Sequence, residues 1–302
     1  MKLDDVDGDD FQMEDRRGQA SGGGGLGGLG SILGGRGKGA KIGIPALIVV
    51  VIGLFISQAT GGGGGSGTGG LDDVLNQLGG QTPTEHTAPA NTNGSKDAQY
   101  VFVGKVGTLL NEYWASYFKS AGESFNPPKA AVFDAPTDTG GCGVGQPEAG
   151  PFYCPPSQEI FIDFGFYEQL EKQLGFKGDF AMAYVMAHEY GHHIQNLLGI
   201  DADVRKAQQG ASQAEVNALS VKLELQADCF AGVWGKSAYQ DKLLDDGDFD
   251  EAIDAAQAVG DDAIQGSNAN QESFTHGTSA QRKQWFTTGF QSGDASSCDT
   301  FS

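Results

Sequence analysis

Residues 179–199 have the apolar periodicity of a buried helix, yet the middle of this segment contains two histidines and a glutamate. His188 and His192 are four residues apart, so a helix places them one turn apart on the same face. Glu189 lies at the flank of that face. Burying such side chains without a partner costs free energy. Any fold of this chain therefore has to supply a partner for this group.

The spacing is that of the HExxH motif. Two histidines so placed can bind one zinc ion, and the glutamate beside them can act as general base on a water molecule. The alternative is a helix in which polar residues happen to be four positions apart. Apolar neighbours such as Met186 and Ile194 argue against it, because they require burial. We expect His188 and His192 to bind Zn²⁺ and Glu189 to be the catalytic base.

A third protein ligand is needed, because catalytic zinc sites use three. The extended motif HExxHxxGxxH is excluded, since Gln195 and Leu198 occupy its last two defining positions. The next long helical pattern, residues 212–239, contains Glu224 and Asp228 at i and i+4 in otherwise apolar surroundings. We expect Glu224 to be the third ligand.

Asp228 has a different expected role. A carboxylate one turn after a ligand can accept the second ring N–H of His188 and so fix its tautomer. The alternative is that Glu224 and Asp228 form a solvated stripe on the helix. Glu215 is a weaker candidate ligand, because its flanks are more polar.

Three segments carry a resemblance to a known family: HEYGHH (188–193), LELQADCFAG (223–232) and HGTSAQRKQWFTTGF (276–290). Together with residues 14–18 and 298–301, they resemble the bacterial putative neutral zinc metallopeptidase family, the YpfJ-like proteins, of the gluzincin type. The resemblance implies a zincin-like fold, a zinc cofactor and peptidase activity on a peptide or protein substrate.

The segment 275–290 predicts another helix, with Thr278 as its N-cap in a capping box. His276 precedes this helix, where the helix dipole disfavours protonation of the ring. Similar zincins place a histidine or tyrosine opposite the zinc to stabilise the oxyanion, and we expect His276 to be catalytic in this way. The alternative is that His276 merely ends a loop. His193 points about 100° away from His192 and is expected to support the ligands or lie at the surface.

Residues 42–59 form the one long apolar run of the chain. They lack a convincing signal-peptidase site, and glycine-rich flanks separate them from any core. We therefore expect a single transmembrane helix at 41–60 rather than a cleaved signal peptide or a core helix. Basic residues precede the run and are sparse after it, so the N-terminus is expected in the cytoplasm and the catalytic domain outside the inner membrane.

The composition divides the rest of the chain. Residues 1–40 are expected to be a disordered cytoplasmic arm and 61–95 a flexible linker, because both are rich in small and polar residues. Residues 96–302 are expected to form the metallopeptidase domain, α+β in class with a small antiparallel sheet. Its strands are predicted near 129–135 and 159–163. Helices are predicted at 97–122, 179–199, 212–239, 249–260 and from 278.

Four cysteines without a CxxC pair argue against a zinc ribbon and favour two disulfides in an oxidising compartment. Cys142 and Cys154 bracket a turn rich in glycine and proline, so their pairing is expected. Cys229 and Cys298 then remain as a pair by elimination.

The net charge of −20 excludes a nucleic-acid partner, because an acidic surface repels phosphates. The sequence thus favours a membrane-anchored zinc metallopeptidase. Two alternatives stay open: a zinc-stabilised scaffold in which His276 is a fourth ligand, and an amidase that acts on a non-peptide amide with the same zinc chemistry. If the enzyme is a zincin, the edge strand along which an extended peptide lies is expected at 158–163.

Overall fold

The computed structural model describes residues 1–19, 97–165, 178–266 and 269–302. The expected transmembrane helix at 41–60 and the linker at 61–95 lie outside the described residues. Within the described ranges, no helix is both long and apolar enough to cross a membrane.

The five helices that periodicity predicts are all present: α3 (Ala98–Ser120), α5 (Asp179–Leu197), α7 (Gln213–Gln240), α8 (Asp248–Ala258) and α10 (Ser279–Ser292). Two shorter helices were not predicted, α6 (Ile200–Gln208) and α9 (Asp261–Gln265). The N-terminal ends of α7 and α10 are fixed locally, because Ser212 and Thr278 each form a capping box with the third helical residue. The α+β class is confirmed.

The main sheet has four strands in the order β1 (Met13–Asp15), β2 (Lys129–Val132), β6 (Glu159–Ile162) and β5 (Phe152–Cys154). β2 is parallel to both β1 and β6, whereas β5 is antiparallel to β6. The sheet is therefore mixed, and the prediction of an antiparallel sheet is wrong. The reason is that β2 and β6 are not joined by one tight turn: a hairpin of β3 (Thr137–Asp138) and β4 (Val144–Gly145), then β5, lie between them.

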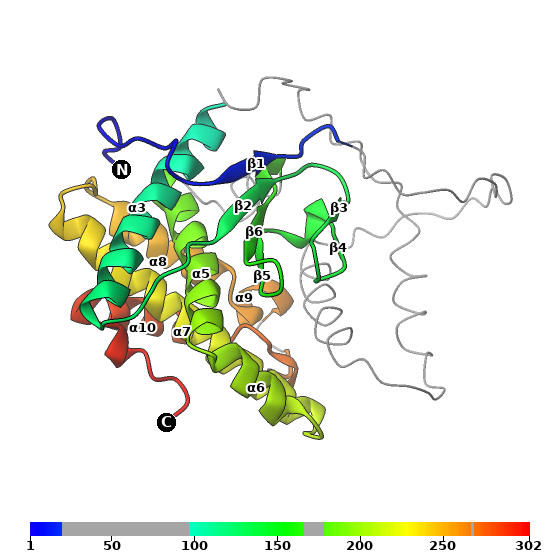
Figure 1. Ribbon diagram of the computed structural model, residues 1–302. Coiled ribbons are helices and arrows are strands. Elements are labelled where there is room, and N and C mark those ends of the chain that lie inside the picture. Colours follow the sequence, from blue (N-terminus) through cyan, green and yellow to red (C-terminus); the bar gives the residue numbers. More distant parts are fainter. Residues whose placement is uncertain (20–96, 166–177, 267–268) are drawn as a thin grey trace, which may run out of the picture.

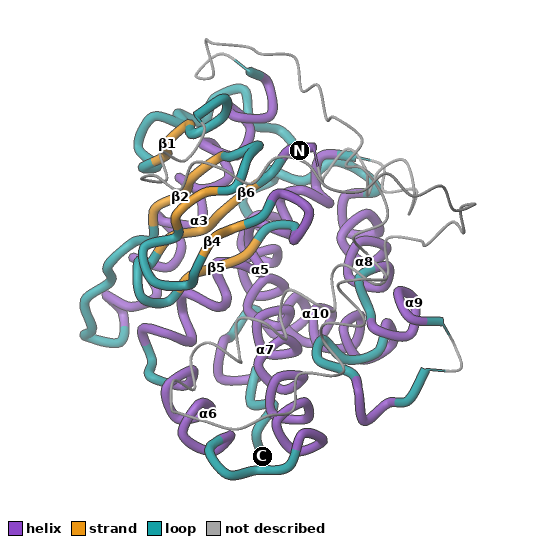
Figure 2. Tube along the Cα trace, turned by 90° about the vertical axis from the view of Figure 1, so that its right-hand side faces the viewer, coloured by secondary structure: helices purple, strands orange, loops and turns teal. Residues whose placement is uncertain are grey.

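The predicted substrate edge at 158–163 is also wrong. β6 has a hydrogen-bonded neighbour on each side, so it is an interior strand. Among the described strands, β5 lies at one edge of the sheet and β1 at the other. β5 lies against α5, the helix that carries the HExxH motif (Figure 2).

The two faces of the sheet pack differently, as the alternation of side chains in a strand requires. Ala130, Val132 and Ile160 belong to the main core, together with residues of α3 and α5. These two helices lie beside the sheet in Figure 1. The opposite face has a small aromatic cluster of its own around Phe133 and Phe161. Both expected disulfides are present: Cys142–Cys154 beside this small cluster, and Cys229–Cys298 between α7 and the C-terminal segment.

Residues 1–19 pack against the domain, and this contradicts the expectation that the whole arm 1–40 is disordered. Leu3 and Phe11 are buried in the main core, and β1 adds a parallel strand beside β2. The prediction rested on a composition poor in apolar residues, but the few that occur are placed where the domain buries them.

Close helix crossings bring the polar residues of the motifs together. A Cβ atom on Gly191 of α5 would lie 2.8 Å from the backbone of Ala227 in α7, and one on Gly289 of α10 would lie 1.9 Å from the carbonyl oxygen of Cys229. Only glycine permits such backbone contact. The three helices α5, α7 and α10 therefore meet closely enough for their side chains to share one site.

We predict that Gly289→Ala lowers the free energy of unfolding by about 2 kcal/mol or more, because the added methyl overpacks the crossing of α7 and α10. Gly235→Ala is the matched control, since a Cβ atom there meets neighbours at ordinary distances of 3.4–3.8 Å. Thermal and urea unfolding of both variants measures the difference. Equal stability of the two variants would contradict the close crossing.

Candidate metal centre

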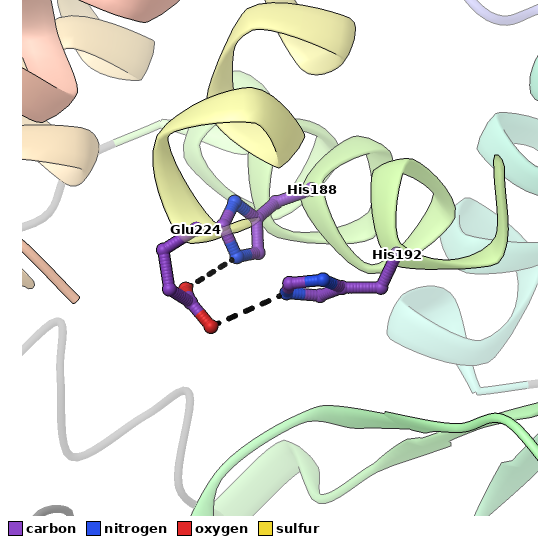
Figure 3. Close-up of side chains that lie close together, drawn as sticks. All are labelled: His188, His192 and Glu224. Carbon is purple, nitrogen blue, oxygen red and sulfur yellow. Dashed lines mark hydrogen bonds and ion pairs between the residues drawn. The ribbon is translucent and has the colours of Figure 1, made fainter. Parts of the chain in front are cut away.

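The two motif histidines and Glu224 converge between α5 and α7 (Figure 3). His188 Nε2 lies 3.1 Å from Glu224 Oε2, and His192 Nε2 lies 3.5 Å from Glu224 Oε1. A potential ligand atom of each residue lies within 4.8 Å of the others. Tetrahedral zinc, with bonds of about 2.0–2.1 Å, separates its ligand atoms by about 3.3 Å. The spacing and the chemistry of these donors therefore fit a zinc ion.

The orientation of His188 is fixed from behind by Asp228. His188 Nδ1 lies 2.8 Å from Asp228 Oδ1, so Nδ1–H donates to this carboxylate while Nε2 points at Glu224. Asp228 is fully buried. The alternative of a solvated stripe formed by Glu224 and Asp228 is therefore wrong.

Two residues that the sequence analysis did not single out complete the surroundings of Asp228. Arg282 of α10 binds the carboxylate through two hydrogen bonds, Nε to Oδ2 at 2.8 Å and Nη2 to Oδ1 at 2.9 Å. The hydroxyl of Tyr184, one turn before His188, donates to Oδ1 at 2.6 Å. Tyr184 could have been found from its i−4 spacing to His188, whereas Arg282 reaches Asp228 only through the packing of α10.

For the carboxyl groups of Asp228 and Glu224, burial and nearby charges shift the pKa in opposite directions. Burial opposes ionisation of Asp228, but attraction to Arg282 and His188 holds its pKa below the usual value. Burial likewise opposes ionisation of Glu224, but His192 and His188 hold its pKa well below the usual value. Both groups are therefore carboxylates, as a ligand and a hydrogen-bond acceptor must be.

Glu189 differs from these two carboxylates. Burial raises its pKa despite the opposing attraction of His192 and His188, and its side chain is nearly enclosed. In the described part of the chain, its carboxylate accepts no hydrogen bond. A carboxylate with raised proton affinity beside a metal site is suited to take up and release a proton.

His276 is buried beside Asp261 rather than in the ligand group. Its Nδ1 lies 3.3 Å from Asp261 Oδ1, while Asp261 Oδ2 accepts the backbone N–H groups of Thr275, His276 and Gly277 at 2.7–3.0 Å. His276 contributes to the low pKa of Glu224, which indicates that its ring lies close to the site. Asp261 was missed in the sequence because its partner lies fifteen residues away in a loop.

His193 and Glu215, the other two residues considered in the sequence analysis, lie outside the ligand group. His193 is fully buried, with Nδ1 2.9 Å from the hydroxyl of Tyr153 and Nε2 2.7 Å from the carbonyl oxygen of Asn126. Burial lowers its pKa to about 4, so the ring is neutral and links α5 to β5. Glu215 lies exposed in the capping box of α7.

A second group of carboxylates, Asp179, Asp248 and Glu251, also has atoms close enough to surround a cation. The N-terminal ammonium group of Met1 lies 2.7 Å from Asp179 and 3.3 Å from Asp248. These two carboxylates thus already contact a cationic group, and we assign no metal to them.

Comparisons with known proteins agree with these motifs. A family model described as "putative neutral zinc metallopeptidase" matches residues 4–301. The uncharacterized protein YpfJ of Escherichia coli K12 is 43% identical over 292 residues, which cover 96% of this chain and 95% of that protein. The uncharacterized protein Rv2575 of Mycobacterium tuberculosis is 45% identical over 192 residues, 59% of this chain and 64% of that protein. No solved structure matches.

We predict that Glu224→Gln weakens zinc binding at least about 100-fold, because a neutral amide replaces the one anionic donor of the group. Glu215→Gln is the control, since glutamine preserves the capping box and this position lies outside the group. Competition with a chromogenic chelator measures both affinities. Unchanged zinc affinity in the Glu224 variant would place the third ligand elsewhere.

Removal of the Arg282 guanidinium should affect both folding and the metal site. We predict that Arg282→Met lowers the free energy of unfolding by about 3–5 kcal/mol, because it leaves the buried Asp228 carboxylate without its cation. Zinc affinity should fall about 10- to 100-fold as His188 loses its fixed orientation. Lys283→Met, at the exposed neighbouring position, should change neither quantity. An Arg282 variant that matches this control in both measurements would contradict the assigned role.

Proposed function

The chain belongs to the putative neutral zinc metallopeptidase family, and we propose that it hydrolyses peptide bonds with a zinc ion held by His188, His192 and Glu224. One observation carries the proposal: these three side chains form a group with the spacing of a zinc site, and Glu189 stands beside it with a raised pKa. A base next to the ligands has a purpose in hydrolysis and none in a purely structural site.

The number of ligands favours catalysis over a scaffold. Structural zinc sites are closed by four protein ligands, whereas catalytic sites use three and keep one position open. Among the described residues, the group at this site has three members, and His276 is not one of them. His276 is instead held by Asp261. An amidase with a non-peptide substrate would use the same residues, so substrate tests distinguish it.

In the proposed reaction, zinc supplies Lewis acidity that polarises the scissile carbonyl group and makes water more acidic. Glu189 takes a proton from the attacking water molecule and then passes it to the nitrogen of the leaving group. His276 donates a hydrogen bond to the oxyanion of the tetrahedral intermediate, and Asp261 orients its ring through Nδ1. Asp228, held by Arg282, keeps His188 in the tautomer that leaves Nε2 free.

The position of β5 supports a peptide or protein as substrate. Among the described strands, β5 lies at one edge of the sheet and beside the helix that carries the motif, where an extended peptide can lie. The two disulfides support an oxidising, extracytoplasmic compartment for the domain. The apolar run 42–59 supports attachment to the inner membrane.

We predict that Glu189→Gln in the full chain abolishes cleavage of denatured casein while one zinc ion per chain is retained, because the variant lacks the base but keeps the three ligands. Glu112→Gln, at an exposed position on α3, is the matched control and should cleave like the wild type. Zinc content and proteolysis are measured on the same preparations. Cleavage by the Glu189 variant at the control rate would rule out this base.

We predict that His276→Gln lowers kcat about 10²- to 10³-fold with unchanged zinc affinity, because it removes a hydrogen-bond donor to the oxyanion. Asp261→Asn should lower kcat as well, since the ring loses the carboxylate that orients it. Loss of zinc from the His276 variant would instead identify this residue as a fourth ligand and favour the scaffold.

A further inference from the structure

Residues 1–19 contribute a strand to the main sheet. Met13, Glu14 and Asp15 pair in register with Ala130, Ala131 and Val132 of β2. Backbone hydrogen bonds continue on both sides of this pairing, from Ala130 N to Gln12 O at 3.0 Å and from Arg16 N to Val132 O at 2.7 Å. The chain before residue 20 is thus hydrogen-bonded to the chain after residue 97.

The same segment fills part of the main core. The ring of Phe11 lies so close to α3 that a Cβ atom on Gly107 would fall 2.2 Å from it. On its other side, Phe11 meets Tyr190 of the HExxH motif, with ring centroids 6.4 Å apart. Leu3 is also buried, and its carbonyl oxygen accepts a hydrogen bond from Lys105 Nζ at 2.7 Å.

Two consecutive arginines fix the end of the segment. Arg16 forms an ion pair with Glu159 of β6 at 2.9 Å, and Arg17 forms one with Asp97, the N-cap of α3, at 2.7 Å. These guanidinium groups also lie 5.5 and 5.3 Å from the ring centroids of Phe161 and Phe164. The segment therefore contacts the sheet and the two helices α3 and α5.

This packing conflicts with a single membrane crossing between residues 19 and 97. One crossing would put β1 and β2 on opposite sides of the bilayer, where they could not share hydrogen bonds. A second copy of the chain could not supply β1 either, because every copy would have the same orientation. The apolar run 42–59 is long enough for one crossing at about 1.5 Å per residue, but not for two.

We propose that residues 1–19 and the described residues after 97 fold as one domain on the same side of the membrane, so that the segment between them does not leave the two parts on opposite sides of the bilayer. The N-terminal segment then shares the compartment that the two disulfides favour. This replaces the expectation of a cytoplasmic N-terminus. The proposal concerns topology and does not depend on peptidase activity.

Thiol labelling of the full chain tests the topology. All four native cysteines are in disulfides, so Asp5→Cys and Tyr239→Cys each introduce the only free thiol, at exposed positions before and after the apolar run. A membrane-impermeant maleimide is applied to spheroplasts before and after permeabilisation. We expect the same pattern for both variants, whether labelling occurs before permeabilisation or only after it. Labelling of one variant before and the other only after permeabilisation would overturn the proposal.

A pair of substitutions tests the docking itself in the purified full chain. Gly107→Ala should lower Tm, because the added methyl group collides with Phe11. In a Phe11→Ala background the same substitution should leave Tm unchanged or raise it, because alanine is the better helix former once the ring is gone. This difference between the two backgrounds is specific to the contact. A Tm that rises with Gly107→Ala in both backgrounds would show that Phe11 is not docked on α3 and would overturn the proposal.

Discussion

The buried carboxylate of Asp228 is the interaction on which the site depends. Asp228 is a residue of α7. Its carboxylate accepts hydrogen bonds from His188 and Tyr184 of α5, and from Nε and Nη2 of Arg282 of α10. An unpaired charge at such a position would be strongly destabilising. The carboxylate therefore requires all three helices in place, and in return it fixes the ring of one proposed metal ligand. Folding of the domain and orientation of His188 are two consequences of one ion-pair network.

The rest of the domain supports this network at a distance. Small residues at the helix crossings allow α5, α7 and α10 to approach at backbone contact. The sheet supports the other side of α5, where β5 lies against it and His193 links the two elements. The N-terminal segment adds Phe11 behind Tyr190, so residues from the first twenty positions help to hold the motif helix. A disturbance of that segment thus reaches the site through the packing of α5.

The local parts of this structure could be predicted from the sequence, and the non-local parts could not. Helix positions followed from apolar periodicity and, for α10, from the capping box at Thr278, which acts within one turn. The convergence of His188, His192 and Glu224 followed from i, i+4 spacing within two helices and from the resemblance to a family. Arg282 could not be assigned, because its partner is 54 residues away and is reached only through tertiary packing. Strand β1 was missed because three residues in a polar segment carry no strand pattern, and its pairing is fixed by anchors on either side.

The central claim is that three protein side chains hold one zinc ion and leave one position open. Anomalous diffraction at the zinc edge, from crystals of the zinc-loaded full chain, tests it most directly. The account predicts one strong peak within about 2.0–2.2 Å of His188 Nε2, His192 Nε2 and a Glu224 oxygen, with no fourth protein ligand. A peak elsewhere, or a fourth ligand from His276 or any other side chain, would contradict it.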